Sequence, residues 1–263
     1  MPLDSVCLEI ALNRQPKWTA RTGATAMAML SALTLLATPG VAASASQNTC
    51  DQDGNTPGAI RACSDLIGSG QLDSATRSRV YFRRATAWLA EEEPAAAVSD
   101  FTRALAFDPT NIAAIEGRAK AYAILGQQDL AAADWSRLIA IKPADDLAYS
   151  GRADAKLAAG SSDDALADYT KAIELNANNR DAFLGRANVY DKLNQRDKVL
   201  NEFALILAID PKYVPAHFAK AQAAERWGEK YLAIESYSAV LKYERLNQAA
   251  RKGLLRLGVF NIP

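Results

Sequence analysis

A block of 34 residues recurs along this chain, and the repetition constrains the fold more than any other feature. Similar residues hold the same places in five consecutive windows, 78–111, 112–145, 146–179, 180–213 and 214–247. A fixed period of this length predicts a stacked array of short units, each packed on its neighbours in the chain.

Each window carries two apolar stripes at helical spacing. With every window numbered from 1, the first stripe holds positions 4, 8 and 11, and the second holds positions 20, 24 and 27. Glycine stands at position 15 as Gly126, Gly160 and Gly228, where the first helix should end. Position 24 is aromatic throughout, as Phe101, Trp135, Tyr169, Phe203 and Tyr237. Each window therefore predicts a helix, a turn and a second helix.

The small residues of the two stripes also have a physical reason. Alanine at positions 8 and 20 lets two helices approach closely, and the aromatic ring at position 24 fills the space beside that contact. This pattern resembles the tetratricopeptide-repeat family over residues 78–247. The resemblance implies an all-α fold, a right-handed solenoid of helical hairpins that forms the tetratricopeptide-repeat superhelix. It implies no single function, because folds of this kind host many tasks.

Residues 1–45 differ in composition from the rest of the chain. Three basic residues precede an uncharged run from Ala24 to Thr38, and small residues follow Pro39-Gly40. This order is typical of a bacterial secretory signal cut after Ala43 or Ala45. The alternative is an uncleaved membrane anchor, although the strongly apolar part spans only about 15 residues and a membrane helix needs about 20. We expect a periplasmic or secreted protein whose membrane contact, if any, is this segment.

Two cysteines remain after such a cleavage, Cys50 and Cys63. In an oxidising compartment we expect them to form a disulfide, which would contribute on the order of 3 kcal/mol by closing the intervening loop. The alternative is a catalytic thiol pair, but the spacing is not that of a C-x-x-C motif.

Both ends of the array need covers. Residues 57–67 match the second half of a repeat. We therefore expect residues 46–77 to form a disulfide-stapled half-repeat cap with a loop. Residues 248–263 predict a C-terminal capping helix. Its basic residues Arg251, Lys252 and Arg256 form either a solvated face or a contact for an acidic partner.

The sequence offers little catalytic or metal-binding chemistry. Its single histidine, His217, falls at position 4 of the fifth window, where the other windows hold core residues, so we expect a core histidine. No Gly-rich phosphate loop or zinc-ligand pattern is present, and the formal net charge is zero. We therefore expect no enzyme activity, catalytic residue, cofactor, metal or nucleic-acid partner; an enzyme built on a solenoid is the remaining alternative.

Charged residues recur with the repeat. Position 7 holds Arg84, Arg118, Arg152 and Arg186, and position 23 holds Asp100, Asp134, Asp168 and Glu202. This spacing predicts structural ion pairs, within one unit or between neighbouring units. If partly exposed, each pair would contribute less than about 1 kcal/mol. The fifth window departs from the pattern with Lys220 and Ser236.

The family resemblance further implies that the first helices line a concave groove. The groove residues we select are Phe82, Leu89, Glu116, Lys120, Asp154, Leu184, Asn188, Asp191, Phe218 and Gln222. They vary between windows while the packing positions do not, as selective binding of a protein or peptide requires. We expect Phe82 and Phe218 to be exposed anchors.

Three alternatives to such a partner arise from the same positions. The groove residues could simply face solvent, or the repeats could bind a second copy of the chain as a homo-oligomer. Some family members bind acidic chaperone tails through groove Lys, Arg and Asn residues. Here only Lys120 and Asn188 fit that set, so we reject this role.

Overall fold

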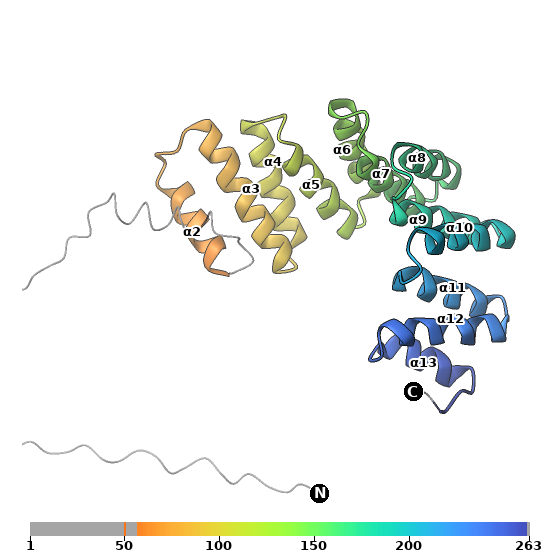
Figure 1. Ribbon diagram of the computed structural model, residues 1–263. Helices are drawn as coiled ribbons and strands as arrows, with labels where there is room; N and C mark the ends of the chain where they lie inside the picture. Colours follow the sequence, from red (N-terminus) through yellow and green to blue (C-terminus); the bar gives the residue numbers. More distant parts are fainter. Residues whose placement is uncertain (1–49, 51–56, 262–263) are drawn as a thin grey trace, which may run out of the picture. The chain divides into compact units, whose positions relative to one another are not determined.

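The computed structural model describes Cys50 and residues 57–261, and this described part is helical (Figure 1). The predicted signal segment, residues 1–45, lies outside the described residues. Among the helices that are described, none combines the length and apolar character that crossing a membrane requires.

Five helical hairpins follow a first helix, and a single helix closes the array (Figure 1). The helices are α2 (Pro57–Gly68), α3 (Ser74–Ala90), α4 (Pro94–Phe107), α5 (Ile112–Ile124), α6 (Gln128–Ile141), α7 (Asp146–Ala158), α8 (Ser162–Leu175), α9 (Arg180–Lys192), α10 (Arg196–Ile209), α11 (Val214–Arg226), α12 (Lys230–Tyr243) and α13 (Gln248–Arg256). Each helix packs on the next one in the chain. The described chain is therefore an all-α solenoid of helical hairpins.

Side-chain caps start most of the first helices. Asp73, Asn111, Asp145, Asn179 and Asn247 each accept a hydrogen bond from the backbone N–H three residues later. Such a bond satisfies an N–H group that has no partner inside the helix. The fifth hairpin begins differently, with Tyr213 at the cap and a proline in the first turn of α11.

The turn inside each hairpin requires one residue in the left-handed region. Gly126, Gly160 and Gly228 adopt φ values of 72°, 90° and 77° there. Glu92 and Asn194 hold the same place in the other two hairpins, with φ values of 60° and 56°. The turn geometry is thus common to all five, and glycine is the residue that adopts it at least cost.

A second set of glycines lets consecutive hairpins stack. Gly151 of α7 lies over the ring of Trp135, so that a Cβ atom on it would come within 2.4 Å of the ring. The same contact joins Gly117 to Phe101, Gly185 to Tyr169 and Gly253 to Tyr237, at 2.4, 2.3 and 2.5 Å. The aromatic residue at position 24 therefore occupies the space that a side chain at position 6 of the next unit would need. Our sequence analysis missed these glycines, although their spacing follows the repeat.

The arginine at position 7 forms a clamp between three helices. Arg118 donates to both carboxylate oxygens of Asp134, from Nε at 2.8 Å and Nη2 at 2.7 Å, and from Nη1 to Thr102 Oγ1 of the preceding hairpin at 3.1 Å. The same three-way contact recurs as Arg84 with Asp100 and Ser64, Arg152 with Asp168 and Ser136, and Arg186 with Glu202 and Thr170. We call each set an arginine clamp.

The acid of each arginine clamp is almost fully buried. The side chain of Asp134 is 8% exposed and that of Arg118 is 15% exposed. Removing one partner would leave the other charge buried and uncompensated. The loss of stability should therefore exceed the value of less than about 1 kcal/mol that we expected for a partly exposed pair. In the third hairpin the acid has two cationic partners: Lys156 Nζ also lies 2.8 Å from Asp168 Oδ2.

All three parts of the clamp change together in the fifth hairpin. Lys220 replaces the arginine, Ser236 replaces the acid, and Ala204 replaces the hydroxyl of the preceding hairpin. Ser236 Oγ is buried without a hydrogen-bond partner. The joint between the fourth and fifth hairpins therefore lacks the clamp found at each earlier joint.

Both ends of the array are covered by packed helices. A disulfide joins Cys50 to Cys63 of α2, and both cysteines pack with Leu66 and Val80. At the other end, Leu254 of α13 packs into the cluster that contains Tyr237.

Substituting Gly151 by alanine should lower the free energy of unfolding by about 1–3 kcal/mol, because the new methyl group would overlap the Trp135 ring. Urea unfolding followed by far-ultraviolet circular dichroism measures the change. Gly68→Ala is the control, since a Cβ there meets nothing within 4 Å. Helix propensity alone would make the Gly151→Ala protein more stable than the native protein. That result would contradict the stacking contact.

Substituting Asp134 by alanine should cost about 3–5 kcal/mol, because Arg118 would remain partly buried without its counter-charge. The matched control is Ser236→Ala, at the same position of the fifth hairpin. It should change the stability by less than about 1 kcal/mol or increase it, because it removes a buried hydroxyl that has no partner. Equal losses for the two proteins in urea unfolding would exclude the clamp as a source of stability.

Candidate partner-binding groove

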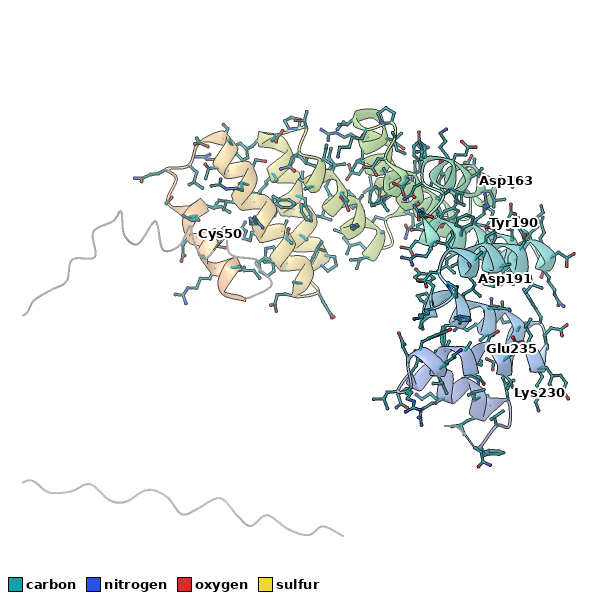
Figure 2. All side chains as sticks on the ribbon, viewed as in Figure 1. Cys50, Asp163, Tyr190, Asp191, Lys230 and Glu235 are labelled. Carbon is teal, nitrogen blue, oxygen red and sulfur yellow. A yellow bond between two sulfur atoms is a disulfide. The ribbon has the colours of Figure 1, made fainter. Side chains whose placement is uncertain are left out.

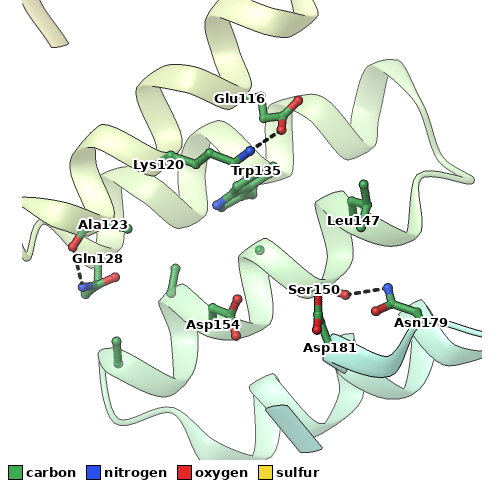
Figure 3. A pocket seen from close by; sticks show the side chains of 13 residues that line it. Glu116, Lys120, Ala123, Gln128, Trp135, Leu147, Ser150, Asp154, Asn179 and Asp181 are labelled. Carbon is green, nitrogen blue, oxygen red and sulfur yellow. Dashed lines mark hydrogen bonds and ion pairs between the residues drawn. The ribbon is translucent and has the colours of Figure 1, made fainter. Parts of the chain in front are cut away.

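The first helices of neighbouring hairpins lie together on one face. Helix α3 contacts α5, α7 contacts α9, and α9 contacts α11. A hollow of about 470 Å³, which we call the central cleft, opens among α5, α6, α7 and the start of α9 (Figure 3). Its lining includes Glu116, Lys120, Ala123, Trp135, Leu147, Ser150, Asp154, Ala158, Asn179 and Asp181.

A second hollow continues this face over α9 and α11. We call it the distal cleft; it measures about 300 Å³ and is lined in part by Leu184, Asn188, Asp191, Gln222 and Arg226. A third hollow, of about 400 Å³, includes Asp154 from the central cleft and Asn188 from the distal cleft. Because the hollows share lining residues, they form one continuous groove.

Seven of the ten groove residues selected from the sequence line this groove. Glu116, Lys120 and Asp154 line the central cleft, and Leu184, Asn188, Asp191 and Gln222 line the distal cleft. Two further residues complete the central cleft, Leu147 and Asp181, and both stand at position 2 of their windows. The sequence pattern places Asp181 on the groove side of its helix, whereas Leu147 was missed.

The other three selected residues lie elsewhere. Phe82 and Phe218 are half-buried, with their rings 5.9 Å from Phe101 and 5.8 Å from Tyr237, and Leu89 packs on the first core cluster. The expected exposure of the two rings is not what the structure shows, because position 5 faces the aromatic at position 24 of the same hairpin. Phe82 also borders a separate hollow beside Phe107.

Asp154 is the central carboxylate of the groove. Tyr169, whose ring belongs to the core, donates its hydroxyl to Asp154 Oδ1. The surrounding protein displaces water from this carboxylate and raises its pKa; Asp181 raises the pKa further, while the tyrosine hydrogen bond lowers it. The side chain nevertheless remains exposed at the cleft. Asp154 is therefore partly shielded from water by its neighbours and still accessible from the cleft.

Asp181 is held in a similar way. Tyr213 donates its hydroxyl to Asp181 Oδ1 at 2.6 Å. Burial and this hydrogen bond raise the pKa of Tyr213 to about 12. The tyrosine therefore remains a proton donor at neutral pH and fixes the direction of the carboxylate.

The acids beyond the central cleft have cationic partners. Asp191 accepts hydrogen bonds from Arg226 and, at 3.0 Å, from the indole N–H of Trp227. Glu225 accepts from Arg256 at 2.8 and 2.9 Å and from the Tyr237 hydroxyl at 2.7 Å. Hydrogen bonding from Arg256 lowers the pKa of Glu225. These contacts join the fifth hairpin to the fourth and to α13.

Two further sequence expectations change in the structure. His217 is half-buried rather than in the core: its Nε2 lies 3.0 Å from the Pro211 carbonyl oxygen and its ring 5.8 Å from that of Tyr243. In the basic cluster of α13, Arg256 is paired with Glu225 rather than solvated alone. Within the described residues, no three His, Cys, Asp or Glu side chains are grouped to hold a metal.

Solved structures share this architecture. A tetratricopeptide-repeat protein from Parabacteroides merdae superposes with a TM-score of 0.67 at 16% identity, over 84% of this chain and 93% of that one. PilW, a type IV pilus biogenesis factor, gives 0.59 at 20% identity, over 69% and 86%. YrrB gives 0.50 at 16% identity, over 73% and 97%. The chain has the tetratricopeptide-repeat fold.

The sequence resemblance to tetratricopeptide repeats is thus confirmed at the level of fold. No protein-family model and no curated protein matches the chain by sequence. Similarity at this level of identity shows the fold alone, and the chemistry of the groove follows from this chain's own residues.

Substituting Asp154 by asparagine should stabilise the protein at neutral pH, by less than about 1 kcal/mol because the side chain still contacts solvent. The folded-state pKa of Asp154 is raised, so its ionised form destabilises the fold above that pKa. This penalty disappears as the pH falls below the unfolded-state pKa. Urea unfolding at about pH 7 and about pH 3 should therefore show a gain that shrinks in acid. A variant less stable than the native protein at neutral pH would show that the charge stabilises the fold.

Proposed function

We propose that this protein is a non-catalytic interaction scaffold that binds an extended segment of a partner protein in the groove formed by the central and distal clefts. The observation that carries the proposal is the contrast between two sets of residues. The packing contacts repeat in nearly every hairpin, whereas the groove positions differ, as at Lys120, Asp154 and Asn188. A rigid frame with varied groove chemistry is suited to selective recognition.

Two of the structurally similar proteins accord with this proposal. YrrB is described as having an unusual peptide-binding site, and PilW as a pilus biogenesis factor. The N-terminal signal pattern supports a role in the cell envelope. The absence of catalysis is supported by the state of the reactive side chains: Cys50 and Cys63 are joined, and His217 contacts a backbone carbonyl.

Site-specific photocrosslinking tests the groove directly. A photoreactive amino acid at Leu147, Asn188 or Gln222 should crosslink the same partner, because all three positions line the groove. The same amino acid at Leu205 or Glu235, on exposed faces of second helices, should not.

The crosslinked product also separates the alternatives. Crosslinks from the second-helix positions alone would place the working surface outside the groove. A product containing a second copy of this chain would indicate self-association in place of a foreign partner.

A further inference from the structure

The central cleft holds two carboxylates that no cation neutralises. Asp154 and Asp181 come from different hairpins and both line this cleft (Figure 3). Each is held by a tyrosine hydroxyl, and within the part of the chain that the structure describes neither forms an ion pair. By contrast, Asp191 of the distal cleft is paired with Arg226 (Figure 2 labels Asp191).

The one cation of the central cleft is already paired. Lys120 Nζ lies 2.6 Å from Glu116 Oε1, one helical turn away. The lining therefore carries three carboxylates, Glu116, Asp154 and Asp181, against a single ammonium group. The distal cleft has one acid and one base in its lining, so the excess of negative charge belongs to the central cleft.

Apolar surface lies beside the unpaired carboxylates. Leu147 is 63% exposed, and the Trp135 ring forms part of the same lining. Lys and Arg side chains match such a site, because their methylene stems pack on apolar surface while the charged end meets a carboxylate. Asp154 is exposed at the cleft, so the charged end of such a side chain can reach it directly.

The geometry points to the central cleft as the docking site for a lysine or arginine side chain of an extended partner segment, with Asp154 and Asp181 receiving the charge. An apolar residue next to this cation would pack on Leu147. This inference rests on the proposed function and specifies the chemistry of the partner. Charge complementarity favours such a partner over an acidic segment, which would meet three carboxylates.

Selection from a library of random dodecapeptides displayed on phage tests the inference with the full chain. The native protein should enrich peptides that carry Lys or Arg beside an apolar residue. The Asp154→Asn/Asp181→Asn protein retains oxygen acceptors for both tyrosine hydroxyls and should lose this enrichment. The matched control is Asp129→Asn/Asp163→Asn, which makes the same charge change at exposed residues in the first turns of α6 and α8 (Figure 2 labels Asp163).

Fluorescence anisotropy with the most enriched peptide then measures the effect. The Asp154→Asn/Asp181→Asn protein should bind it about tenfold more weakly, and the control should remain within about twofold of the native protein. If both variant proteins lose the same amount of peptide affinity, the effect is due to net charge alone, and the inference is overturned.

The selection also separates this inference from the proposed function. The enriched peptides could show no preference for Lys or Arg and still be blocked by Asn188→Arg and Gln222→Arg. That result would overturn the cationic site but support binding in the groove. If no peptide is enriched, or if neither the arginine substitutions nor Asp154→Asn/Asp181→Asn weaken the binding of any enriched peptide, both proposals fail.

Discussion

The structure depends on the contact between an aromatic ring and a glycine of the next hairpin. The ring at position 24 is buried in every hairpin, and at four joints it lies against a glycine whose missing side chain makes room for it. This contact fixes how closely consecutive hairpins approach. At three of these joints the residue after the glycine, Arg118, Arg152 or Arg186, also forms a clamp with the preceding hairpin. Packing therefore sets the geometry, and the buried ion pairs make it specific.

The joint between the fourth and fifth hairpins lacks both of these contacts and is held in another way. Ala219 stands where the second, third and fourth hairpins have glycine, and the arginine clamp is replaced by residues that cannot form it. The link is made from the groove side, where Asp191 accepts hydrogen bonds from Arg226 and Trp227. A groove acid thus serves the fold at this joint.

The repeat made the fold predictable from the sequence, while the groove chemistry was predictable only in part. Helical periodicity and position 15 indicate hairpins without any tertiary information, and the pairing of Arg118 with Asp134 follows from their constant spacing. The hydroxyl partner was missed, although Thr102, Ser136 and Thr170 also stand at a constant spacing from their arginines. Phe82 and Phe218 were expected to be exposed but are half-buried. Whether such a ring faces solvent depends on the side chain opposite it in the same hairpin. Whether a cation reaches Asp154 depends on the directions of the neighbouring long side chains. These directions are set by the tertiary structure and not by a local sequence pattern.

One core position connects the packing of the array to the chemistry of its groove. Position 24 needs only an aromatic ring to fill the joint, and Phe101, Trp135 and Phe203 meet that need. Tyr169 and Tyr237 meet it too, but each also carries a hydroxyl that donates to a carboxylate, Asp154 in the groove or Glu225 outside the two clefts. A carboxylate tied to a buried ring has fewer accessible orientations than a free surface side chain, so it loses less entropy when a partner binds. Tyrosine in place of phenylalanine at this packing position thus orients Asp154 in the groove at no cost to the stacking contact.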